Sequence, residues 1–66
     1  MQLNFTSGLY MFELTPIEGN ELVCKLATYR WNGDGWSFES LEAVYFKDSE
    51  TKENYIKTLI RRFNHD

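Results

Sequence analysis

The sequence predicts an α+β domain, an antiparallel meander of three to four strands packed on one face by a single C-terminal amphipathic helix. Three observations predict it. Apolar residues alternate within 9–15 and 21–31, a strong hairpin turn follows at 32–35, and apolar residues recur at helical spacing after Asp48. With 66 residues the chain has room for one domain, residues 1–66, and one core.

The two clearest strands each divide their side chains between two faces, because successive residues of a strand point in opposite directions. We expect one set of alternate residues to lie under the helix: Tyr10, Phe12, Leu14, Leu22, Cys24 and Leu26. The opposite face would then show Leu9, Met11, Val23, Ala27, Tyr29 and Trp31. Residues 16–20 contain Pro, Gly and Asn and predict a turn between the two strands. Residues 2–6 fit a short edge strand or a lead-in.

The segment 32–35, Asn-Gly-Asp-Gly, favours a hairpin, because these dipeptides adopt the positive φ angles of primed turns. Trp31 and Trp36 flank it, so we expect them to pair across the turn. Residues 40–47 fit both a helical stripe and strand alternation. We favour a strand with a bulge or turn near Ser40, because a better helix start follows at once.

That start is Asp48-Ser49, where either residue can cap the helix and where Glu50 and Glu53 suit the positive end of the helix dipole. One apolar stripe follows over about four turns. It comprises Tyr55, Ile56, Leu59, Ile60 and Phe63. The bases near the C-terminal end suit the negative end of the dipole, although they also form a small basic patch: Lys57, Arg61 and Arg62.

A single helix covers only one face of a sheet, and the predicted opposite face does not alternate cleanly to polar residues. An exposed apolar patch of this kind often marks an interface. Two other outcomes are open at this point. The N-terminal strand could fold back across the face, or sheet curvature could bury it.

The sequence shows no recognisable catalytic equipment, and we expect no enzyme, no cofactor and no metal. Cys24 lies mid-strand on the predicted core face and His65 lies in the tail, so neither forms a nucleophile and base pair. One Cys and one His are too few for a zinc site, and a single Cys excludes an intramolecular disulfide. Counted from Asn32, the fifth and twelfth positions are Trp36 and Ala43, which fails the EF-hand pattern.

The formal net charge is −3, which argues against a protein that binds the phosphate backbone generically. Residues 1–46 hold six acids against Lys25 and Arg30. Their carboxylates would mimic DNA only if five of them cluster on one surface: Glu13, Glu18, Glu21, Glu39 and Glu42.

No signal peptide or membrane span is visible, and a free thiol fits a reducing compartment, so we expect the cytoplasm.

The sequence therefore predicts a module that binds another protein through an aromatic sheet surface or an exposed strand edge, and it argues against direct nucleic-acid binding and against a membrane. The expected anchors are aromatic, with an acidic rim that steers a basic, nucleic-acid-handling partner: Tyr29, Trp31, Trp36 and Phe38, then Glu39 and Glu42. Small domains without motifs are often inhibitors or regulators, and mobile-element or phage proteins that block a host protein commonly have this form. Two alternatives remain, a homodimer or larger homo-oligomer formed through the outer sheet face, and a single-stranded nucleic-acid binder. The affinity of a protein for nucleic acid should fall steeply as the salt concentration rises, whereas an apolar homodimer should barely respond to salt.

Overall fold

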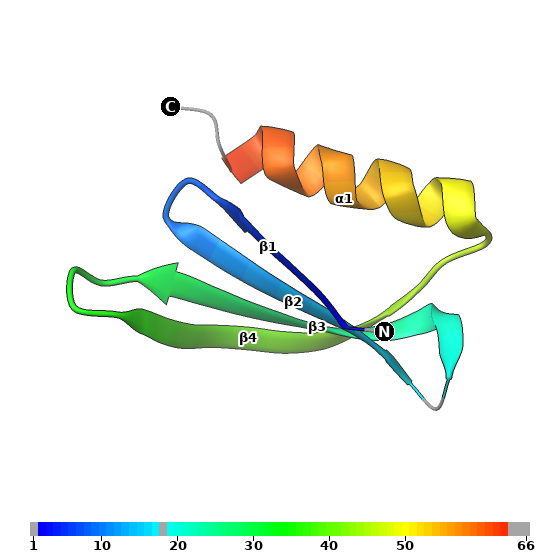
Figure 1. Ribbon diagram of the computed structural model, residues 1–66, viewed down its shortest axis with the longest axis horizontal. Helices are drawn as coiled ribbons and strands as arrows, with labels where there is room; N and C mark the ends of the chain where they lie inside the picture. The colour runs from blue at the N-terminus through cyan, green and yellow to red at the C-terminus, as the bar shows by residue number, and fades with distance from the viewer. Residues whose placement is uncertain (1, 18, 64–66) are drawn as a thin grey trace.

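The computed structural model describes residues 2–17 and 19–63, apart from the side chain of Phe63. Four antiparallel strands form one sheet in the order β1-β2-β3-β4, and one helix packs against one face of it (Figure 1). The elements are β1 (Leu3–Ser7), β2 (Tyr10–Ile17), β3 (Asn20–Trp31), β4 (Trp36–Tyr45) and α1 (Ser49–Phe63). The predicted α+β meander with a C-terminal helix is confirmed.

The first two hairpins are tighter than the sequence indicated. Gly8, with a φ of 61°, allows β1 to return as β2 through a two-residue turn, so Leu9 lies in the turn rather than in the strand. The turn predicted over 16–20 is also shorter, since Ile17 still belongs to β2 and Asn20 opens β3. Pro16 is tolerated in the strand because the pairing register shifts directly after it.

The third hairpin follows the prediction. The backbone N–H of Asn32 donates to the carbonyl oxygen of Gly35 at 3.0 Å. The side-chain oxygen of Asn32 accepts bonds from the N–H groups of Asp34 and Gly35 at 2.9 and 3.0 Å, and Gly33 supplies a φ of 102°. Trp31 and Trp36 are paired across this turn as expected.

Strand β4 runs through the segment that was ambiguous in sequence, so residues 40–45 are strand, as favoured. Thr28 pairs with Ser40 and Tyr29 pairs with Phe38, which leaves Glu39 as the extra residue of a bulge beside Ser40. The extra residue shifts the alternation by one position. As a result, one face of β4 carries apolar side chains on both sides of the bulge: Trp36, Phe38, Leu41, Ala43 and Tyr45.

The core lies between the other face of the sheet and α1. Its buried members come from β2, β3, the segment after β4, and the helix: Phe12, Leu14, Cys24, Leu26, Phe46 and Leu59. Tyr55 and Ile56 of the helix pack against them, and Ile60 is half-buried, while the Phe63 side chain lies outside the described part. The hydroxyl of Ser7, buried at the end of β1, donates to the carbonyl of Ile60. The predicted core face is therefore confirmed, with Phe46 as an addition.

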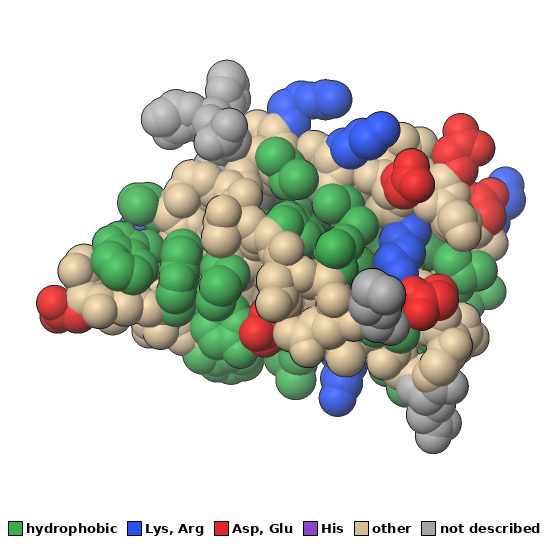
Figure 2. Space-filling view, viewed as in Figure 1, with side chains coloured by type: hydrophobic (Ala, Val, Ile, Leu, Met, Phe, Trp, Pro, Cys, Tyr) green, Lys and Arg blue, Asp and Glu red, His purple; other side chains and the backbone are tan. Residues whose placement is uncertain are grey.

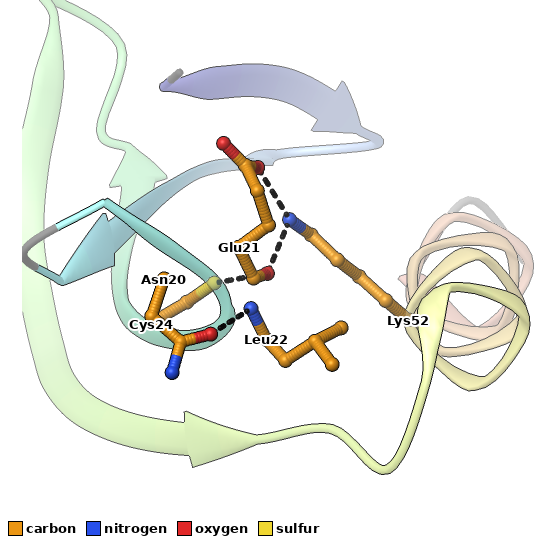
Figure 3. Close-up of polar contacts among 5 residues, drawn as sticks. All are labelled: Asn20, Glu21, Leu22, Cys24 and Lys52. Atoms are coloured by element: carbon orange, nitrogen blue, oxygen red, sulfur yellow. Dashed lines mark hydrogen bonds and ion pairs between the residues drawn. The ribbon is translucent and has the colours of Figure 1, made fainter.

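The N-terminal half of α1 is joined to the start of β3 by polar contacts (Figure 3). The ammonium of Lys52 donates to the carbonyl oxygen of Glu21 at 2.8 Å and contacts its carboxylate at 3.4 Å. The thiol of Cys24 donates to the same carbonyl oxygen at 3.4 Å, and the N–H of Leu22 donates to the side chain of Asn20.

Within the described chain, no helix has the length and apolar character that crossing a membrane requires.

Asp48 caps this helix, because its carboxylate accepts a bond of 2.8 Å from the N–H of Thr51. That bond holds the pKa of Asp48 below its ordinary value of 3.8. The stability it contributes is therefore present above that ordinary value and is lost as the pH falls through the lower pKa of the folded state. We expect Asp48→Ala to lower the Tm by several degrees at pH 7, and the deficit to shrink in strong acid to what the uncharged capping oxygen contributes.

Thermal unfolding from pH 7 down to pH 2 measures this difference. Asp48→Asn is the matched control, since it keeps a capping oxygen but cannot ionise. A deficit of Asp48→Ala that persists unchanged in strong acid would show that the carboxylate charge plays no part.

Candidate functional site

The face of β3 and β4 that points away from α1 is apolar and uncovered among the described residues. We call it the outer face. Its most exposed side chains leave between 39 and 77 % of their area accessible: Trp36, Trp31, Phe38, Leu41 and Tyr45. Hydrophobic side chains gather at the left end of the view, where β3 turns into β4, and on the lower side of the sheet, away from the helix (Figure 2). Strand β1 pairs at the sheet edge with β2 instead of folding across this face, which resolves one of the open alternatives.

The rings of the outer face pack against one another in two rows. Trp31 and Trp36 meet edge to face with ring centres 5.3 Å apart, and Tyr29 and Phe38 do so at 5.8 Å. Both pairs are directly opposite in the β3–β4 ladder. Such contacts stabilise the rings in one arrangement, so a partner would meet side chains that have already lost part of their rotational freedom.

Two charged residues belong to this face within the described ranges 2–17 and 19–63, Glu13 on β2 and Lys25 on β3. The hydroxyl of Tyr29 donates to the carboxylate of Glu13 at 3.0 Å. This hydrogen bond, then burial, then the negative charge of Glu13 raise the pKa of Tyr29 above its ordinary value. Tyr29 is therefore a neutral hydrogen-bond donor that positions a carboxylate beside the aromatic rows.

The structure separates the six residues predicted to form the site. Tyr29, Trp31, Trp36 and Phe38 come together on the outer face, as expected. Glu42 pairs with Leu26, whose side chain is buried under the helix, so Glu42 points to the helix side of the sheet. Glu39 lies at the bulge and lines the same side. Glu42 therefore does not rim the aromatic rows, whereas Glu39 also lines a pocket with Trp31 near the hairpin.

Glu39 and Glu42 instead border a groove of about 390 Å³ between α1 and β4. The helix lies over β1 and leaves the helix side of β4 largely uncovered (Figure 1). The side chains of Phe12, Leu26 and Leu59 contribute apolar lining, and Arg62 lines the groove from α1. Burial raises the pKa of Tyr55 in this groove, and the Glu42 carboxylate raises it further while Arg62 opposes them.

The structure also bears on the charge-based alternatives. The acids needed for DNA mimicry do not share a surface, since Glu13 lies on the outer face, Glu42 on the helix side, and Glu21 bonds to Lys52. Glu18 lies outside the described residues. Arg30 pairs with Ser37 on the helix side, although it lines a pocket with Trp31, and Lys25 is the one cation among the described residues of the outer face. A nucleic-acid platform would need a positive groove, which these described residues do not form.

Sequence reasoning missed two large members of the outer face, Leu41 and Tyr45. The signal was present as a change of phase, because apolar residues stand at even positions in Trp36 and Phe38 and at odd positions in Leu41, Ala43 and Tyr45. A phase change of one residue inside a strand indicates a bulge. Reading it would have placed both side chains beside Phe38.

Comparison of the chain with protein-family models, with curated proteins and with solved structures found no match. Within residues 2–17 and 19–63 no three His, Cys, Asp or Glu side chains come together as metal ligands would. Cys24 is buried in the core, as expected of a small apolar side chain, and His65 lies outside the described part.

Proposed function

We propose that this protein is a non-catalytic module that binds another protein through its outer face. The observation that carries the proposal is the pair of packed aromatic rows left exposed on the side of the sheet that the helix does not cover. Trp and Tyr are the residues in which interface energy most often concentrates, and here two Trp stand in contact at one end of the face.

The size of the exposed surface supports this proposal. At roughly 150–250 Å² for each aromatic side chain, four of them expose roughly 300–550 Å² in total: Trp31, Trp36, Phe38 and Tyr45. A stable complex buries about 800 Å² on each partner. The outer face would therefore supply the apolar centre of such an interface, and polar groups around it would supply the rim.

The more specific form of the proposal is a small inhibitor or regulator, of mobile-element or phage type, that acts in the cytoplasm by blocking a host protein. Its support is the small size of the chain and the absence of catalytic motifs in the sequence. A buried free thiol also suits a reducing compartment. The acidic residues would favour a basic partner surface, although they lie around the domain and not as a rim of the outer face.

A photocrosslinking amino acid placed at position 38 tests the proposal directly. Phe38 is more than half exposed on the outer face, and p-benzoylphenylalanine keeps its aromatic ring. We expect irradiation in the host cell to give a covalent adduct with one or a few partner proteins. The same amino acid at position 57, on an exposed part of α1, is the matched control and should not give that adduct. Adducts at position 57 but none at 38 would contradict the proposal.

A homo-oligomer is the second candidate, and one observation favours it. The described outer face carries only Glu13 and Lys25 as charged residues, and obligate homodimer interfaces are more apolar than transient ones. In that case the partner crosslinked at position 38 would be a second copy of the chain. The adduct would then have twice the mass of one chain, which is 7.9 kDa. The one experiment therefore separates the two candidates.

A further inference from the structure

Strand β4 forms one edge of the sheet, and no described strand lies beyond it. The phase of its hydrogen bonds can be derived from its two ends. The N–H of Asn32 donates to Gly35 before the strand, and the N–H of Phe46 donates to Leu22 after it. Antiparallel ladders alternate between bonded and non-bonded pairs. The backbone groups of Leu41, Ala43 and Tyr45 therefore point away from β3, towards the open edge.

Natural proteins usually protect such an edge with Pro, charged residues, bulges or a covering segment. In β4 the bulge at Glu39 alters the strand before Ser40, but it leaves residues 40–45 regular. That stretch contains no Pro and one charged residue, Glu42. We call residues 40–45 the acceptor edge.

The two sides of the acceptor edge differ in chemistry. On the outer side, Leu41 and Tyr45 are 59 and 77 % exposed. On the helix side, Glu42 and Glu39 line the groove beneath α1, whose described lining includes one cation, Arg62, and Arg30 lines a neighbouring pocket with Glu39. A strand laid along this edge would alternate in the same way, with one set of side chains on the apolar outer face and the other set beside two carboxylates.

We propose that the acceptor edge binds an extended segment of a partner protein as a fifth strand. The segment would alternate apolar residues, which face Leu41 and Tyr45, with Lys or Arg residues, which face Glu42 and Glu39. Main-chain hydrogen bonds would supply affinity and the alternating side chains would supply specificity. This inference rests on the proposed protein-binding function and names the chemistry of the partner.

Charge favours a basic segment over a second copy of this chain. Two copies joined edge to edge would bring the Glu39 and Glu42 carboxylates of both chains onto one side of a continuous sheet. A residue directly opposite Glu42 would occupy a non-bonded pair, in which Cα atoms approach to about 4.5 Å. A Lys or Arg there lies close enough for a cross-strand ion pair.

The probe is the synthetic peptide Lys-Val-Lys-Thr-Lys-Val-Lys, titrated at low salt into the full chain labelled with ¹⁵N. We expect amide shifts concentrated in residues 40–45. The peptide Glu-Val-Glu-Thr-Glu-Val-Glu is the charge control and should bind at least several-fold more weakly. A Lys peptide N-methylated at both Val residues is the backbone control and should not bind, because those amides would face β4.

Two variants of the chain complete the test. Ala43→Pro removes an N–H that points to the open edge, where Pro is tolerated, so the domain should stay folded while the shifts disappear. Glu42→Lys should weaken the Lys peptide by roughly two- to tenfold and strengthen the Glu peptide. If Ala43→Pro does not fold, the N-methylated peptide gives the same answer.

Shifts that fall outside residues 40–45, or equal binding of the N-methylated peptide, would overturn strand addition. Equal binding of the Lys and Glu peptides would overturn the basic segment. A partner crosslinked at position 38 together with no peptide binding would leave the proposed function standing and remove only the acceptor edge.

Discussion

Leu14→Ala is expected to lower the free energy of unfolding by about 2–5 kcal/mol, whereas Leu41→Ala should change it by about 0.5 kcal/mol or less. The two residues make a matched pair, since both are Leu and both lie within strands. Leu14 is 1 % exposed between the sheet and the helix, and Leu41 is 59 % exposed on the outer face. The first substitution leaves a cavity in a close-packed core, and the second removes atoms that already contact water.

A loss of this size is large for a chain of 66 residues, because small domains have a total stability of roughly 3–10 kcal/mol. Leu14→Ala should therefore shift the midpoint of urea unfolding far downward and leave part of the population unfolded in buffer. Circular dichroism along a urea series measures both variants. Equal losses for the two variants would mean that the outer face is buried in solution, as in a stable dimer that forms on folding.

The core face was predictable because side chains of a strand alternate with a period of two. A shift of one residue would move every side chain of the strand to the opposite face. Once Phe12 and Leu14 are placed under the helix, their neighbours Met11 and Glu13 must point the other way. The same rule fixed Cys24 and Leu26 on β3. The helix was equally predictable, since Asp48 supplies a cap and the apolar stripe recurs at helical spacing.

The surfaces were less predictable, because they depend on register between strands and not on the pattern within one strand. The bulge at Glu39 decides which face of β4 the later residues join, and it sent Glu42 to the helix side. Phe46 joined the core because it continues the helix-side alternation of Glu42 and Val44, and its ring packs on Tyr55 at 5.2 Å. Both placements depend on the register that the bulge sets between β3 and β4.

The positions of the aromatic residues follow from the presence of one helix. Residues 49–63 supply enough apolar surface to cover a single face of the sheet, and they cover the one that holds Phe12 and Leu26. The aromatic residues of the hairpin lie at the end of β3 and β4 on the opposite face, where they contact each other. A fold that needed them for its own core would place them under the helix, which supports the proposal that they bind a partner.

Trp31→Ala is expected to reduce affinity for the crosslinked partner by about 30-fold or more, because truncating an interface hot spot costs at least about 2 kcal/mol. Trp31 is 40 % exposed and contacts Trp36, so its removal should also cost roughly 1–2 kcal/mol of stability. The domain should remain folded despite that cost. Affinity is measured by calorimetry or surface binding at a temperature at which circular dichroism shows the variant folded.

Phe38→Ala separates the two effects further, because Phe38 is 58 % exposed and contributes less to folding. It should lose affinity to a similar degree while its Tm stays closer to that of the native chain. Lys57→Ala, on the exposed side of α1, is the control and should leave both quantities unchanged. If Trp31→Ala lost stability and affinity in equal measure, and Phe38→Ala lost neither, Trp31 would belong to the core of the hairpin and the partner would bind elsewhere.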